Sequence, residues 1–142
     1  MGALLEKFGR WRTSPRLAAA VEVACLIPAA ALLIVGLIAW GGYFWIAREI
    51  QAVADDALAA AVAELNVEAR EGSAKAEAAR ALAARSGLLP GSMRLSVVSQ
   101  PTELTVLLVY DASRSPMFAL SRLMPMPSPV IVRSASERLS AS

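Results

Sequence analysis

The sequence predicts a membrane-anchored α+β protein. A long N-terminal helix is expected to span a membrane and continue outside it, and a small antiparallel sheet of about three strands follows. The first observation is an apolar run without a charged residue from Val23 to Ala47, which as a helix is about 37 Å long at ~1.5 Å per residue. That length crosses a hydrocarbon core of about 30 Å. The other observations are an alanine-rich segment of helical period after the run, and three β-rich segments after it.

The charge distribution predicts the orientation of the span. The net charge of +2 arises at the N-terminal end: residues 1–16 hold four basic residues and one acidic residue, Glu22 adds one negative charge, and residues 48–142 hold ten basic and ten acidic residues. Basic residues favour the cytoplasmic side of a membrane. We therefore predict a cytoplasmic basic arm at 1–16, a transmembrane helix at 17–47, an extracytoplasmic helical region at 48–86 and a β-rich head at 87–142.

Aromatic residues mark the outer end of the apolar run. Trp40, Tyr43, Phe44 and Trp45 cluster there, and such rings favour the membrane interface, so they predict the exit from the lipid. Pro28 lies inside the run and lacks a backbone N–H, so we expect a helix kink there.

Three further features of the N-terminal half leave alternatives open. The glycines at 36, 41 and 42 allow close approach of a second helix or simply face lipid. Apolar side chains at helical spacing in residues 1–16 fit either a helix on the membrane surface or a basic tail. The small residues Ala29–Ala31 resemble a signal-peptidase site, but the run exceeds the usual 7–15 residues of a secretory signal, which favours a permanent anchor.

Helical periodicity continues after the span. Apolar residues recur at three- and four-residue steps from Ile50 onwards, which predicts that the helix runs on to about Arg70. A break is expected at Glu71–Ser73, whose serine caps a second helix at 74–85. Gly87 is expected to close that helix.

The remaining chain is typical of strands. Residues 93–99 and 103–110 are β-rich and are separated by a short polar loop, so they predict a hairpin, and residues 130–139 predict a third strand. Residues 111–129 are proline-rich and irregular. Within them we expect a helical turn packed on the sheet, formed by Phe118, Leu120 and Leu123.

The composition argues against several kinds of chemistry. The chain has no histidine, and its one cysteine, Cys25, lies in the span, which argues against a zinc or copper site and excludes a Ser-His or Cys-His nucleophile. Asp55 and Asp56 diverge by about 100° on a helix and make a poor catalytic pair. Glu64, Glu68 and Glu71 fit a solvated helix face better than a loose cation site. We expect no enzymatic activity, no cofactor, no small-molecule substrate and no nucleic-acid partner.

Glu22 is the most unusual residue of the N-terminal half. A carboxylate about one turn inside an apolar span is costly and faces either a partner or the lipid headgroups at the edge. It ends the segment Leu17-Ala-Ala-Ala-Val-Glu22, and Pro28 follows six residues later. This N-terminal region resembles that of type IV pilin-like proteins. The shared features are a basic leader, small residues, Val-Glu, and an apolar run that contains a proline.

The resemblance is strongest to the TadE-like family of minor pilins in Tad (tight adherence) pilus systems. It covers most of the chain from Leu17 onwards: an alanine-rich helix after the span, a strand ending at Tyr110, a Pro/Leu-rich loop, and a final strand with Ser-Ala-Ser. It implies a pilin-like fold in the bacterial inner membrane, with the N-terminus cytoplasmic and the head in the periplasm or in a pilus. The implied partners are other pilin-like subunits, the assembly machinery and membrane lipid.

In that family a prepilin peptidase cuts after a glycine, and Leu17 occupies this position here. A cut would make Ala18 the first residue and Glu22 the fifth, so that Glu22 pairs with the new ammonium group of a neighbouring subunit. Without a cut, the chain is an anchored accessory factor of a secretion or envelope complex, with Glu22 binding a partner in the assembly platform. A membrane-tethered sensor is a third alternative, for which the short head leaves little room.

Overall fold

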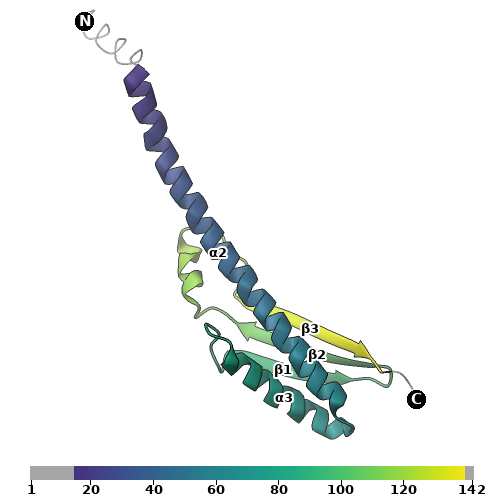
Figure 1. Cartoon of the computed structure of the whole chain (residues 1–142). Helices are drawn as coiled ribbons and strands as arrows, with labels where there is room; N and C mark the ends of the chain where they lie inside the picture. Colours follow the sequence, from purple (N-terminus) through teal and green to yellow (C-terminus); the bar gives the residue numbers. More distant parts are fainter. Residues whose placement is uncertain (1–14, 140–142) are drawn as a thin grey trace, which may run out of the picture. The chain divides into compact units, whose positions relative to one another are not determined.

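The computed structural model describes residues 15–139 of the chain (Figure 1). The predicted cytoplasmic arm, apart from its last residues, lies outside this range. The elements in chain order are helix α2 (Pro15–Ala63), helix α3 (Val67–Ala84), strand β1 (Met93–Ser99), strand β2 (Glu103–Asp111), the 3-10 helix η1 (Pro116–Arg122) and strand β3 (Val130–Arg138). The predicted α+β class, with a long apolar N-terminal helix and a small antiparallel sheet, is confirmed.

Helix α2 begins at Pro15, a residue that suits the first turn because its missing N–H would have no partner there. It continues through Pro28 and past the apolar run to Ala63, which confirms that the apolar helix extends beyond the expected span. The contacts of the chain divide it into two units between Ile38 and Ala39. The first unit contains only the N-terminal part of α2 among the described residues, and the second contains everything from Ala39 onwards, called the head below.

The predicted helix boundary at Glu71–Ser73 is wrong. Helix α2 ends at Ala63, and α3 begins at Val67, so the break lies at residues 64–66 and the predicted break is inside α3. Asn66 decides the position, because its Oδ1 accepts a hydrogen bond from the backbone N–H of Glu68 at 2.9 Å and caps α3. The expected cap, the hydroxyl of Ser73, instead donates to Glu64 Oε2 at 3.2 Å.

Replacing Asn66 with alanine is expected to lower the free energy of unfolding by about 1 kcal/mol, because the first turn of α3 loses its side-chain acceptor. Asn66→Asp is the matched control, since a carboxylate oxygen accepts the same bond. Chemical denaturation of the full chain in detergent measures both. Equal destabilisation by the two variants contradicts the capping role.

The three predicted strands are confirmed and form one antiparallel sheet with the order β1-β2-β3. Val97 pairs with Val106 in the first ladder, and Tyr110 pairs with Ile131 in the second. The predicted hairpin loop is closed by a hydrogen bond of 2.8 Å from the backbone N–H of Gln100 to the carbonyl of Glu103. The sheet has two open edges, β1 and β3, with β2 paired on both sides.

One face of the sheet packs against the part of α2 that belongs to the head and against α3, which lie side by side in Figure 1. Burial alternates along β2, as expected for a strand with one covered face. Small residues let the helices approach: Ala54, Ala57 and Ala61 of α2 and Ala74 and Ala78 of α3 are fully buried. The buried Tyr110 accepts a hydrogen bond from the backbone N–H of Leu89 at 2.9 Å, so its hydroxyl also has a partner.

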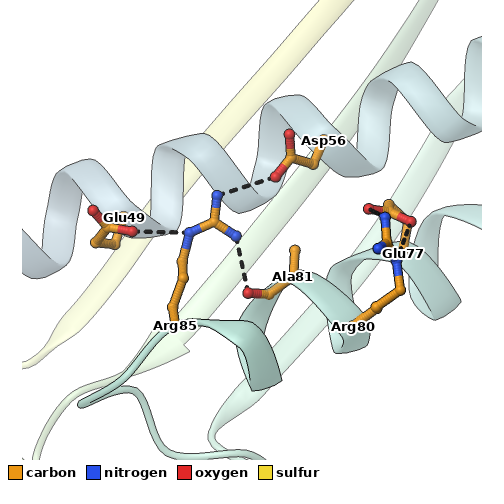
Figure 2. A network of polar contacts seen from close by, with 6 residues as sticks. All are labelled: Glu49, Asp56, Glu77, Arg80, Ala81 and Arg85. Carbon is orange, nitrogen blue, oxygen red and sulfur yellow. Dashed lines mark hydrogen bonds and ion pairs between the residues drawn. The ribbon is translucent and has the colours of Figure 1, made fainter.

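Arg85 joins the two helices at the end of α3 (Figure 2). Its Nε donates to Glu49 at 2.8 Å, one terminal nitrogen donates to Asp56 at 3.1 Å, and the other donates to the carbonyl of Ala81 at 2.9 Å. Glu49 and Asp56 lie two turns apart on α2, so one guanidinium contacts both. Gly87 follows with φ +89°, as expected for the residue that closes this helix.

The predicted helical turn in the loop before β3 is present as η1, but its packing differs from the expectation. Phe118 is buried in the core, as predicted. Leu123 is 67% exposed, so it does not pack on the sheet. The sequence pattern identified an apolar turn here but did not tell which of its side chains faces the core.

Candidate functional site

The N-terminal part of α2 leaves its apolar side chains uncovered. Every large apolar residue from Leu17 to Ile38 except Val35 is exposed, with Leu37 reaching 67%. The most apolar stretch of the helix is only 6% buried, which argues against the core helix of a soluble protein. Within residues 15–139, α2 is the one helix long and apolar enough to cross a membrane, although a signal sequence near the N-terminus shares these properties.

The free-energy consequence of this exposure is large. Each large apolar side chain contributes about 1.5–3 kcal/mol when it is fully removed from water. Covering this part of α2 therefore gains on the order of 10 kcal/mol, as much as the whole folding free energy of a typical domain. The segment from Leu17 to Ile38 is about 33 Å long at ~1.5 Å per residue, which matches a hydrocarbon core of about 30 Å.

Glu22 lies on this exposed helix. Its neighbours at helical spacing are Ala18, Ala19, Cys25 and Leu26, none of which is charged. In the part of the chain that the structure describes, no cation forms an ion pair with Glu22 and no group donates to it. A carboxylate on an apolar surface that has no partner among the described residues is suited to bind a cation of another molecule. Leu17 and Ala18, the predicted processing residues, are exposed in the first turns of the same helix.

The apolar run is exposed in its N-terminal part and buried in the head at its C-terminal end. Ile46 and Ala47, at its end, are buried in the core of the head. The predicted interface aromatics divide accordingly: Trp40, Phe44 and Trp45 are exposed, whereas Tyr43 turns to the head and meets the ring of Phe118 edge-on, with 6.5 Å between ring centroids.

Gly42 is where η1 approaches α2. A Cβ atom on this glycine would lie 2.9 Å from Cε of Met117, so the absence of a side chain makes room for that methionine. The sequence left open whether the glycines at 36, 41 and 42 allow close approach of a second helix or face lipid; here Gly42 lies against Met117 of the same chain, and Gly41 faces open space. Sequence reasoning missed this contact, because its only signal was a small residue among aromatic ones.

Several acidic residues of the helical region have partners within the head, and the contact of Asp56 joins two helices. Asp56 binds Arg85, Asp55 accepts from Gln51 at 3.0 Å, and Glu71 forms an ion pair with Lys75. Across residues 15–139, no group of three or more potential metal ligands gathers at one place. Arg85 was not singled out by the sequence, although the spacing of Glu49 and Asp56 on one helix face was a signal for a shared cation.

No protein-family model, curated protein or solved structure matches the chain. Among the described residues, the exposed apolar part of α2 with Glu22 is the candidate functional site.

Proposed function

We propose that the chain is a single-pass, pilin-like subunit of a Tad-type pilus, with the part of α2 before Ala39 in the bacterial inner membrane and the head outside the cytoplasm. The observation that carries this proposal is one continuous helix that is uncovered and apolar in its N-terminal part and packed into a small head in its C-terminal part. Lipid, or the apolar helices of other subunits, would cover the exposed side chains.

The proposed assembly role rests on two features of α2 that need a partner, namely its apolar surface and the carboxylate of Glu22. The apolar part of α2 packs laterally against other helices or lipid, and Glu22 pairs with a cation from a neighbouring subunit. In a low-dielectric environment such a pair is favourable only when both charges meet, so Glu22 fixes how far one helix slides along another. The proposed work is binding and assembly, without catalysis or a cofactor.

The alternative is an anchored accessory factor that stays in the membrane as part of a secretion or envelope complex. Leu17 favours this alternative, because a prepilin peptidase acts after glycine in the resembling family. Both functions share the span, its orientation and Glu22 as a binding group. They differ in whether the N-terminus is processed and whether the chain leaves the membrane.

Fractionation of cells that express the chain tests the membrane placement. We expect the full chain to resist extraction with alkaline carbonate, and its head to be cleaved by protease added from the periplasmic side. Recovery of the chain in the soluble fraction, or cleavage only from the cytoplasmic side, contradicts the proposed placement.

N-terminal sequencing of the recovered chain separates the two functions. A subunit that enters the filament is expected to begin at Ala18 and to appear among surface filaments removed by shearing. A chain that begins at Met1 and is absent from sheared filaments is the anchored accessory factor.

A further inference from the structure

The surface around η1 contains an open pocket that the proposed assembly role does not use. Its volume is about 500 Å³, within the range of small-molecule sites. Polar side chains provide much of its lining, with two guanidinium groups and several hydroxyls; the residues that matter below are Ser113, Arg114, Ser115, Phe118, Ser121 and Arg122. We call this the η1 pocket.

Ser115 is the unusual member of the η1 pocket. It is only 6% exposed and is the single buried polar residue of the described chain. Within residues 15–139, its hydroxyl makes no hydrogen bond: it does not cap η1, and no other side chain contacts it as donor or acceptor. A buried hydroxyl without a partner is unfavourable, and here it lines a pocket that can hold a ligand acceptor.

The charges at the η1 pocket favour an anion. Arg114 and Arg122 are exposed arginines that form no ion pair with any described residue. Asp111, three residues before Arg114 in the chain, is already engaged: the backbone N–H of Ser113 donates to its Oδ1 at 2.9 Å and lowers the pKa of Asp111, with smaller contributions from the Ser113 hydroxyl and Arg114. These three charged groups leave a net charge of +1 beside the pocket. Two guanidinium groups and hydroxyl donors match the oxygens of a phosphate.

Packing places the η1 pocket beside the aromatic residues of α2. Met117 sits over Gly42, and Phe118 meets Tyr43, so η1, drawn in light green in Figure 1, lies at the level of Trp40–Trp45. Leu123, directly after Arg122, is largely exposed. Exposed aromatic rings, an exposed leucine and unpaired arginines at one level are the side chains found at a membrane–water interface.

We propose that the η1 pocket binds the phosphate of an anionic phospholipid headgroup in the outer leaflet of the membrane that α2 crosses. Arg114 and Arg122 hold the phosphate oxygens, the hydroxyls of Ser115 and Ser121 donate to them, and Leu123 enters the acyl region. This inference rests on the proposed span of α2. It gives the head a second attachment to the membrane.

The proposal is tested by measuring which ligands the full chain retains in detergent micelles, using native mass spectrometry. The three probes are phosphatidylglycerol, phosphatidylcholine and inorganic phosphate. Wild type is expected to retain phosphatidylglycerol most strongly. The double variant Arg114→Gln/Arg122→Gln should lose affinity for it by about tenfold or more, because both charge-assisted contacts are removed. Arg138→Gln is the matched control, an exposed arginine of the head outside the pocket, and should bind as wild type.

Ser115→Ala provides a second readout. Because the hydroxyl has no partner within the described chain, its removal should leave thermal stability unchanged or raised while lowering phosphatidylglycerol retention. A purely structural role of Ser115 would instead lower stability. The Cβ atom is kept, so the packing around it is preserved.

The outcomes separate this inference from the proposed function. Equal retention of phosphatidylglycerol by wild type and the double variant overturns the inference while the span stands. Inorganic phosphate that competes at the same concentration as the lipid assigns the pocket to a soluble phosphate and also overturns it. Insertion is measured separately by carbonate extraction, and a chain that fails to insert overturns both.

Discussion

Replacing Glu22 with alanine is expected to reduce filament assembly by at least tenfold without impairing membrane insertion. Insertion and assembly respond differently because both depend on the negative charge of Glu22. Removing a carboxylate from the apolar helix lowers the free-energy cost of placing α2 in lipid, so insertion is maintained or improved. The same change removes the only acidic group of that exposed stretch, so a cation on a neighbouring subunit loses its partner in a low-dielectric environment. Sheared filaments quantified by immunoblot, with carbonate extraction in parallel, measure both effects.

Two variants control for this result. Glu22→Gln keeps the size and hydrogen-bonding capacity of the side chain but not its charge, so it should fail as Glu22→Ala does if an ion pair is responsible. Glu68→Ala removes an exposed carboxylate from α3, outside the apolar helix, and should leave assembly normal. Normal assembly with Glu22→Ala contradicts the proposed role of this carboxylate, whichever function the chain performs.

Replacing Arg85 with methionine is expected to destabilise the contact between α2 and α3 by about 2 kcal/mol. The change removes three hydrogen bonds and leaves Glu49 and Asp56 without their cation. Loss of one partner of a fully buried ion pair costs about 3–5 kcal/mol, and the value is smaller here because Arg85 is 23% exposed and its partners are partly solvated. Amide hydrogen exchange of the full chain should quicken by about 30-fold in α3, since 1.4 kcal/mol corresponds to a factor of ten.

Arg80→Met is the matched control on the same helix. Arg80 is also an arginine with a bidentate carboxylate contact, to Glu77, but its side chain is 77% exposed and screened by water, so its removal should destabilise the protein much less than removal of Arg85. Strand β2 should exchange slowly in both variants, because its core is intact. Equal effects of the two substitutions would show that Arg85 acts only as a surface charge.

Sequence reasoning predicted the elements whose signal is local. The strands at Met93–Ser99 and Glu103–Asp111 were found because β-branched residues and a turn loop define them over short distances. The helix boundary was misplaced because two local signals competed. Gly72 and Ser73 suggested a break, but glycine costs only about 1 kcal/mol inside a helix. The carboxamide of Asn66 supplied the cap earlier in the chain.

By itself, the sequence determined that a long apolar helix precedes a small β-rich unit, that the predicted span at 17–47 holds one acidic residue, Glu22, and that the chain has no histidine. Only the tertiary structure decided how the apolar run is shared: Leu37 is exposed, whereas Ile46 is buried in the head. Composition measures how strongly a side chain avoids water, and lipid and protein interior satisfy that tendency equally well. The contacts of Arg85 with Glu49 and of Gly42 with Met117 join residues far apart in the chain, so a local pattern could suggest that a partner exists but could not identify it.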